Sequence, residues 1–172
     1  LLPLQPQSIN IAVAQAGGDV LCSAKPLHNN AIISDEPYIR RALEHEVLSV
    51  GSLQIDPDSD GVGVKFAYPV KPDPDSASPI AAVVAVVSLD WWNNALADEG
   101  LPEGTMALIT DPAGQIIAIF PENKDVLGST VTEVGFTEEI FWNGAEEGEF
   151  VNPSGSLKRI FFHQPLFTGS DQ

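Results

Sequence analysis

One short segment carries the residue types of a metal site. Residues 56–61 read D-P-D-S-D-G, which places carboxylates at alternate positions before a glycine. This is the pattern of the first half of a calcium-binding loop, where oxygen ligands alternate around a hard cation. The twelfth position of such a loop requires a bidentate glutamate, but Ala67 stands there, within an expected strand. We therefore expect no metal, with Asp56, Asp58 and Asp60 as the candidate ligands if calcium does bind.

Residues suited to enzyme chemistry are few. The histidines at positions 28, 45 and 163 have no metal-ligand spacing. Cys22 is the single cysteine, so the chain can form neither an internal disulfide nor a cysteine-based zinc site. The sequence contains no nucleophile elbow, phosphate-binding loop or dinucleotide fingerprint. We expect no catalytic residues and no cofactor, although the abundant carboxylates leave paired-acid glycoside hydrolysis open.

Composition and charge narrow the classes of partner. The 172 residues include 24 acidic and 8 basic side chains, a formal net charge of −16. Such a surface repels nucleic acid and anionic lipid, so neither is expected as a partner. Hydrophobic residues make up 44% of the chain, which is sufficient for packed cores. The longest apolar run, residues 80–87, is shorter than the ~20 residues that span a bilayer and indicates a buried strand.

The chain nearly repeats itself. Several turn and strand-end residues recur 96 positions apart, within two hairpins of the same pattern, IAVAQAGGDVLCSA (11–24) and ALITDPAGQIIAIF (107–120). Two copies of one supersecondary unit indicate two similar domains in tandem. We place the first at 1–98 and the second at 99–172. The recurring pairs are Gly18 and Gly114, Pro57 and Pro153, Phe66 and Phe162, and Pro69 and Pro165.

The element order of the first copy follows from turn and capping residues. Gly17 and Gly18 suit a tight hairpin turn. Ser34 or Asp35, followed by Pro37, is typical of a helix start. Asp90 is expected to cap a second helix, which links the copies. The expected elements are strands at 9–16 and 19–24, a helix to about residue 46, strands at 48–55, 62–70 and 80–89 in an antiparallel sheet, and a helix at 91–99.

The second copy is expected to contain strands near 105–111 and 115–120, a helix near 133–142, and strands near 147–152 and 157–166. Its sequence ends seven residues after Pro165, before any counterpart of the strand at 80–89. We therefore expect the chain to be a fragment of a longer protein.

Six segments carry a resemblance to a known family. They read SDEPYIRRAL (34–43), VGSLQI (50–55), VKFAYPV (64–70), VVAVVSLDWW (83–92), LPEGTMALITDPAGQIIA (101–118) and VLGS (126–129). In this order they resemble the double Cache family of bacterial sensor domains. The resemblance implies an α+β fold of two tandem PAS-like modules, each an antiparallel sheet flanked by helices.

The same resemblance implies a function. It indicates an extracytoplasmic, small-molecule-sensing region of an inner-membrane signal transducer: a histidine kinase, a diguanylate cyclase or a chemoreceptor. Such receptors are homodimers anchored by membrane segments absent from this sequence. Two other functions stay open. One is a secreted carbohydrate-binding or small hydrolytic domain, and the other is a ligand-free structural spacer with collapsed pockets.

The family's ligand pocket lies between the sheet and the helix that begins near residue 37. Tyr38 matches the family's motif tyrosine, but Glu36 stands where arginine is usual. Arg40 or Arg41 could replace that arginine, because a guanidinium can pair bidentately with a ligand carboxylate. The alternative is that both arginines are solvated partners of nearby glutamates. We predict Arg41 as the ligand-binding arginine.

Three further residues complete the predicted site. Phe66 and Tyr68 alternate on one strand, so they point to the same face, and the Tyr68 hydroxyl needs a polar partner. Ser88 is a small polar residue at the end of the strand at 80–89. The aspartate with which amino-acid-binding members hold the ligand ammonium group is missing near Val86.

Overall fold

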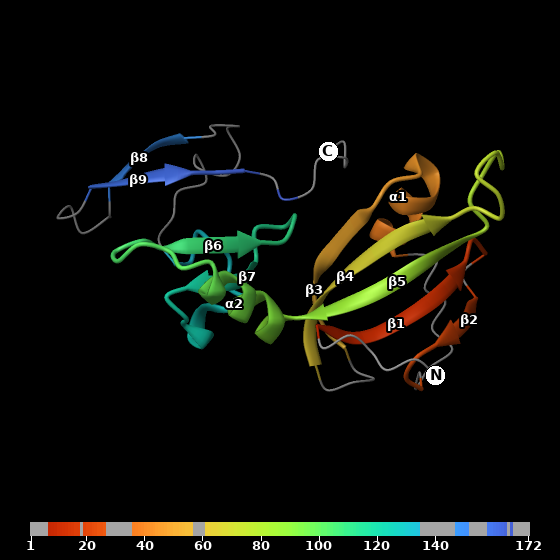
Figure 1. Ribbon diagram of the computed structural model, residues 1–172, viewed down its shortest axis with the longest axis horizontal. Helices are drawn as coiled ribbons and strands as arrows, with labels where there is room; N and C mark the ends of the chain where they lie inside the picture. Colours follow the sequence, from red (N-terminus) through yellow and green to blue (C-terminus); the bar gives the residue numbers. More distant parts are fainter. Residues whose placement is uncertain are drawn as a thin grey trace.

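The chain adopts an α+β fold in a computed structural model, which describes residues 7–17, 19–26, 36–56, 61–134, 147–151, 158–164 and 166. The described residues contain a five-stranded antiparallel sheet, two α-helices and two smaller two-stranded sheets (Figure 1). The described part of the chain contains no helix that is both long and apolar enough to cross a membrane.

The first hairpin forms as expected. β1 (Ser8–Gln15) pairs antiparallel with β2 (Val20–Ser23). Alternate residues of β1 are buried, as a strand with one covered face requires. The buried Asn10 uses its side-chain oxygen to accept hydrogen bonds from the Ile11 and Lys25 backbone N–H groups, at 2.9 and 3.1 Å. This amide therefore ties the end of β2 back onto β1.

Helix α1 (Pro37–His45) begins one residue later than its capping pattern suggested. The N-cap is Glu36, whose side chain makes no capping hydrogen bond, so the prediction of Ser34 or Asp35 as the cap is wrong. The reason is Pro37 at the first helical position: its ring holds the preceding residue in an extended conformation, here with φ −69° and ψ 121°.

The sheet is completed by β3 (Ser49–Asp56), β4 (Gly61–Val70) and β5 (Ala81–Ser88). The strand order is β2-β1-β5-β4-β3, with every pair antiparallel, which confirms the sheet expected for the first half. β5 lies at the centre and is apolar along nearly its whole length, as a strand with neighbours on both sides and covered faces should be. β3 forms one edge.

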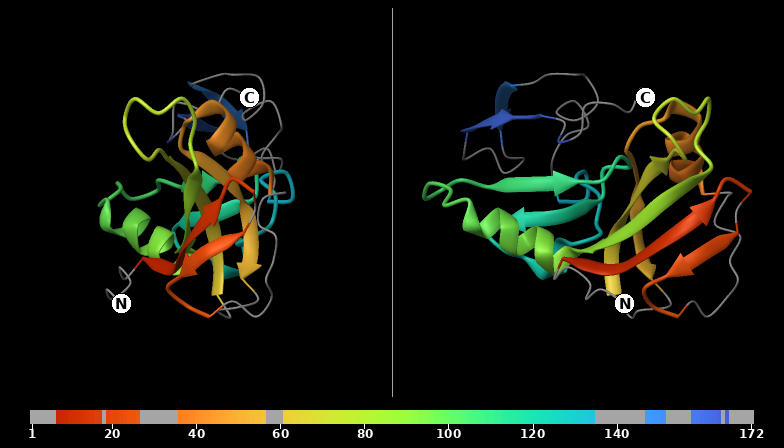
Figure 2. Two further views of the ribbon diagram at one scale, coloured as in Figure 1. Left: turned by 90° about the vertical axis from the view of Figure 1, so that its right-hand side faces the viewer. Right: turned by 45° about the vertical axis from the view of Figure 1, so that its right-hand side comes forward.

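The α1 side of the sheet is the main core. Helix α1 packs over β3, β4 and β5 (Figure 2), and its buried residues Tyr38, Ile39 and Ala42 contact small side chains of the sheet. Because these sheet residues are short, the helix can approach closely. Burying an aliphatic side chain of the size of Ile39 contributes about 1.5–3 kcal/mol. The sheet residues of this core are Ala14, Ala67, Ala82 and Val84.

Helix α2 (Leu89–Asp98) follows β5 without a loop. Its N-cap is Ser88, whose Oγ accepts a hydrogen bond from the Trp91 N–H at 3.1 Å, so the prediction of Asp90 as the cap is wrong. Asp90 instead lies in the first turn, where its carboxylate is favoured by the helix dipole. The helix therefore starts closer to the sheet than the sequence indicated.

The second half contains the expected hairpin of β6 (Ala107–Thr110) and β7 (Ile116–Phe120), with Gly114 at the turn in a left-handed conformation, φ 79°. A short 3-10 helix, η2 (Lys124–Val126), follows, and β8 (Glu147–Val151) pairs with β9 (Lys158–Phe162) as predicted. The helix expected near 133–142 lies almost entirely outside the described residues. Among the described residues the strands form one five-stranded sheet and two small ones, so this part of the chain shows a single clear module.

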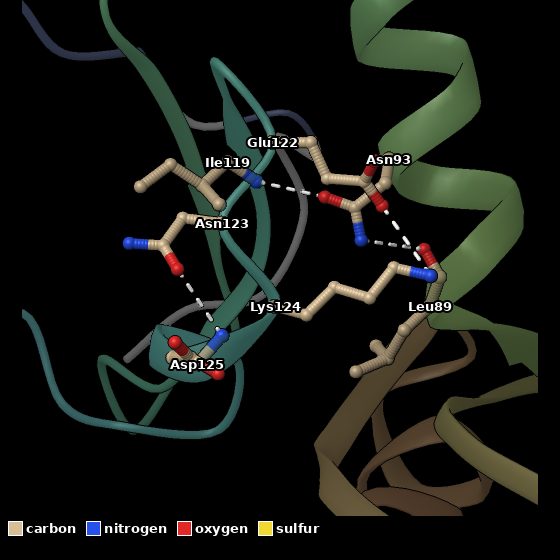
Figure 3. A network of polar contacts seen from close by, with 7 residues as sticks. All are labelled: Leu89, Asn93, Ile119, Glu122, Asn123, Lys124 and Asp125. Atoms are coloured by element: carbon tan, nitrogen blue, oxygen red, sulfur yellow. Dashed lines mark hydrogen bonds and ion pairs between the residues drawn. The ribbon is translucent and has the colours of Figure 1, made fainter.

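A second buried amide holds α2 to β7 (Figure 3). Asn93 is 6% exposed, and its side-chain NH2 donates to the Leu89 carbonyl while its oxygen accepts from the Ile119 N–H, both at 3.0 Å. The hydrophobic contacts between the two halves surround this region, with Val64, Leu89 and Ile117 at their centre. The β6–β7 hairpin is thereby fixed to the helix that leaves the first sheet.

Candidate functional site

Tyr38 lies deep between α1 and the sheet. It is 4% exposed, and its ring packs on the backbone of Gly51 in β3. A Cβ at position 51 would lie 3.0 Å from Tyr38 Cδ1, closer than most side-chain atoms approach, so a larger residue would need the Tyr38 ring to shift. Burial raises the pKa of Tyr38 well above its ordinary value, and the nearby charge of Glu36 raises this pKa further. The phenol is therefore neutral and available as a hydrogen-bond donor.

The structure separates the two arginines of α1. Arg40 is exposed, whereas Arg41 is half-buried and its Nη2 donates to the Val50 carbonyl of β3 at 3.2 Å. The Arg41 Nε is buried and has no hydrogen-bond partner. The ion pairs between described residues, Lys71 with Glu46 and Lys124 with Glu122, involve neither arginine. Of the two, Arg41 is therefore the one placed to act between helix and sheet.

Ser49 adds a second polar group with no partner. It is 1% exposed, and its Oγ is buried without a hydrogen-bond partner. Ser49 precedes Val50, whose carbonyl accepts from Arg41, and it pairs across the sheet with Ala67 of the α1 core. Buried polar atoms are almost always hydrogen-bonded to protein or to water, so these two groups on neighbouring elements are candidate partners for a polar molecule. Nothing in the sequence distinguished Ser49 from any other strand serine.

A β-bulge shapes this part of β3. Val50 is paired with Phe66 and Leu53 with Val64, so the register shifts between Val50 and Leu53. Gly51, against the Tyr38 ring, lies within this irregular stretch. Bulges bend a strand and change the direction of its side chains, and they often lie beside functional sites. The bulge brings the Tyr38 contact and the Arg41 hydrogen bond to one short segment.

Phe66 and Tyr68 do not join this group. Ala67, between them in sequence, is buried against α1, so its two neighbours lie on the opposite face of the sheet. Phe66 stacks on Trp92 of α2, with ring centroids 6.2 Å apart and planes at 26°. Tyr68 is 60% exposed. The structure thus does not bring the predicted aromatic pair together with Tyr38 and Arg41.

The remaining predicted residues lie elsewhere. The Ser88 hydroxyl caps α2 at the C-terminal end of β5, whereas the β5 residues that pack under α1 are Ala82 and Val84. Residues 57–60, with Asp58 and Asp60, lie outside the described residues, and Asp56 is the last residue of β3. Within the described ranges no group of three or more His, Cys, Asp or Glu side chains could hold a metal ion.

A buried carboxylate joins the second hairpin to the bulge. Asp111 is 4% exposed, and its Oδ1 accepts from the Ala113 and Gln115 N–H groups of its own turn, at 2.8 and 2.9 Å. Its Oδ2 accepts from the Leu53 N–H of β3 at 2.8 Å. The D-P-A-G sequence of this turn is a signal for the local bonds. The bond to Leu53, across 58 residues of sequence, carries no local signal and was missed.

No family model matches the chain, and no curated protein matches it by sequence. Solved structures do match in fold. The ligand-binding domain of the Pseudomonas fluorescens chemoreceptor CtaA, in complex with L-isoleucine, aligns with a TM-score of 0.61 and 16% identity, over 89% of this chain and 60% of that domain. The extracellular domain of rpHK1S-Z16, assigned as a histidine kinase, aligns with a TM-score of 0.60 and 17% identity, over 90% of this chain and 64% of that one.

A more distant match is the ligand-binding domain of the Pseudomonas aeruginosa amino acid chemoreceptor PctC in complex with GABA, with a TM-score of 0.52 and 16% identity, over 74% of this chain and 55% of that one. At these identities the likeness establishes the fold. The chain is structurally similar to Cache-type ligand-binding domains of chemoreceptors and sensor histidine kinases. It spans about 60% of the length of the CtaA domain that it matches.

Proposed function

We propose that this chain is the small-molecule-sensing, extracytoplasmic region of a membrane-bound signal transducer, either a chemoreceptor, a histidine kinase or a diguanylate cyclase. The fold supports this class, because its structural neighbours are ligand-binding and extracellular domains of such proteins. The observation that carries the proposal is the pair of buried, unpartnered polar groups between α1 and β3, Arg41 Nε and Ser49 Oγ. The chain itself is proposed to bind and not to catalyse.

The chemistry of this pair favours a ligand with a carboxylate. A guanidinium is always charged, and after its Nη2 has bonded to Val50 its Nε still needs an acceptor. The Ser49 hydroxyl can donate to the same anion, and the neutral Tyr38 phenol is a further donor on α1. Two of the neighbours above were solved with a bound ligand, L-isoleucine in one and GABA in the other. Both ligands carry a carboxylate. Phe66, Tyr68 and Ser88 are outside this proposed site.

The organisation of the whole protein is proposed from the internal repeat. We place a membrane-distal PAS-like module at 1–98 and a membrane-proximal one at 99–172, as in double Cache domains. The recurrence of β1–β2 and β6–β7 as hairpins of one sequence pattern supports this division. Homodimerisation and membrane anchoring are proposed for the full-length receptor, and its sensing region would then face the periplasm or the cell exterior.

The test is a thermal-shift screen of the chain against amino acids, other small carboxylates and neutral metabolites, with parallel samples containing calcium or a chelator. A ligand present at a hundred times its dissociation constant stabilises the fold by about 2.7 kcal/mol, which gives a clear shift in Tm. We expect a carboxylate to give this shift. A shift with calcium alone would favour the acidic 56–61 loop as the binding element, and no shift with any compound would favour a ligand-free spacer.

Matched variants then locate the binding. Arg41→Gln removes the guanidinium between helix and sheet, whereas Arg40→Gln removes the same charge from the exposed neighbouring position. We expect Arg41→Gln and Ser49→Ala to abolish the carboxylate-dependent shift and Arg40→Gln to preserve it. If Arg40→Gln and Arg41→Gln weaken the shift equally, the effect is one of general charge and the assigned site is wrong.

A further inference from the structure

Asp111 is positioned unlike an ordinary turn aspartate. Its two oxygens accept hydrogen bonds from three backbone N–H groups, two in its own turn and one, that of Leu53, in the edge strand of the other half. Both side-chain atoms must therefore be acceptors. An ionised carboxylate meets this need, because both of its oxygens accept and neither carries a proton. An isosteric amide would present its NH2 group to one of these N–H groups. The turn therefore has a specific need for a carboxylate.

The N–H group that Asp111 holds belongs to the bulge. Leu53 ends the irregular stretch that begins after Val50, and its side chain also lies close to the second half, where a Cβ on Gly128 would come within 3.3 Å of Leu53 Cδ2. A bulge leaves backbone groups without a ladder partner, and the Asp111 carboxylate supplies one of them with an acceptor. The conformation of the bulge thus depends on a residue of the β6–β7 turn.

The same bulge forms one wall of the candidate site. At its start, the Val50 carbonyl accepts from Arg41, and Gly51 supports the Tyr38 ring. Within residues 50–53 of β3, two different elements therefore make contacts. Helix α1 contacts residues 50 and 51, and the second hairpin contacts residue 53. A change at either end of this four-residue stretch must be accommodated by the other.

We propose that Asp111 is a positioning residue for the α1–β3 site: through its hydrogen bond to Leu53 it sets the bulge that places Val50 and Gly51 against Arg41 and Tyr38. The β6–β7 turn and helix α1 are consequently coupled through the bulge. The ligand-binding role of this coupling rests on the proposed function, but the coupling itself does not. The same path would let occupancy between α1 and β3 reach the second half of the chain.

Amide hydrogen exchange of the ligand-free protein, measured residue by residue, tests the proposal in both directions. Asp111→Asn is expected to speed exchange of the Leu53 amide roughly tenfold to a hundredfold, the factor that follows from losing a hydrogen bond to a charged acceptor. It should also speed exchange in α1 several-fold. In the reverse direction, Arg41→Gln should speed exchange of the Leu53, Ala113 and Gln115 amides several-fold.

The matched control is Asn10→Ala. Asn10 is also buried and also accepts from two backbone N–H groups. It lies in β1, however, which is separated from the bulged strand β3 by β5 and β4. At equal global stability, this variant should leave the α1 and Leu53 amides unchanged. Arg41→Gln replaces a half-buried side chain, so the reverse arm stays informative if Asp111→Asn does not fold.

The outcomes separate two ideas. If Asp111→Asn affects only the 111–115 turn and Leu53, and Arg41→Gln leaves the Asp111-bonded amides unchanged, Asp111 is a local structural residue and the proposal is wrong. Because no ligand is added, this result would leave the proposed sensor function standing. Coupled exchange without any carboxylate-induced thermal shift would support the positioning role of Asp111 and contradict the proposed binding of a carboxylate.

Discussion

The turns of the two repeated hairpins are held in different ways. In the second, the turn is closed by Asp111, which is buried and reaches across to β3. The position 96 residues earlier is Gln15, which is exposed at the end of β1, and a Cβ on Gly17 of that first turn would meet nothing within 4 Å. The first turn is tied to the sheet by the backbone alone, through the Ala16 N–H, which donates to the Ile80 carbonyl at 3.0 Å, whereas the second turn is tied to β3 by the Asp111 side chain. The difference lies in one side chain and not in the hairpins themselves.

The strongest way to break this contrast is to truncate both side chains. Asp111→Ala leaves three backbone N–H groups without their acceptor, so we expect a loss of about 2–4 kcal/mol in the free energy of unfolding. Gln15→Ala removes an exposed side chain and should change it by less than about 0.5 kcal/mol. Urea denaturation with unchanged m-values measures both. Similar losses for the two variants would mean that the turns are energetically equivalent.

A pair of glycines sharpens the contrast at the backbone. Gly51→Ala puts a methyl group 3.0 Å from the Tyr38 ring, which cannot move away from its buried position without repacking α1. We expect a loss of about 1–3 kcal/mol in stability. Gly17→Ala, in the open turn, meets no atom and should be within about 0.5 kcal/mol of the parent. Thermal unfolding of the two variants is the measurement, and an unaffected Gly51→Ala would show that the bulge can relax.

The smallest expected effect is a pH dependence of the free energy of unfolding. It distinguishes the face of the sheet that α1 covers, with Tyr38, from the opposite face, with Tyr68. Because the pKa of Tyr38 is raised in the folded state, the unfolded chain loses this proton first as the pH rises past about 10. Stability should therefore be full below that pH and fall above it. Tyr38→Phe should flatten the fall, while Tyr68→Phe, on the exposed side, should leave it unchanged. Equal alkaline unfolding profiles in all three proteins would contradict the burial argument.

Much of the fold could be predicted from the sequence, because strands, turns and helix starts have local signals. The strands of both halves lie within a few residues of their expected positions. The caps of both helices were misassigned because local geometry decided them: Pro37 fixes the start of α1, and β5 runs directly into α2. Neither position can be read from a capping residue alone.

The site was harder to predict than the fold. Tyr38 and Arg41 of the candidate site could be placed together from the sequence because they lie on one short helix. Grouping them with Phe66 and Tyr68 required knowing which face of β4 the helix covers, and this is set by Ala67 packing under α1. Asp111 matters through a hydrogen bond to a strand of the other half, and Ser49 through the burial of its unpartnered hydroxyl; neither property leaves a trace in a neighbouring stretch of sequence.

The absence of a loop between β5 and α2 has a mechanical consequence. Ser88 is at once the last residue of the central strand and the cap of the helix, and Asn93, five residues on, is bonded to β7. Residues 81–98 are therefore one continuous strand and helix that starts between β1 and β4 and is bonded to the second hairpin. We expect a displacement of the middle of the sheet to reach the second hairpin, because no loop lies between β5 and α2 to absorb it.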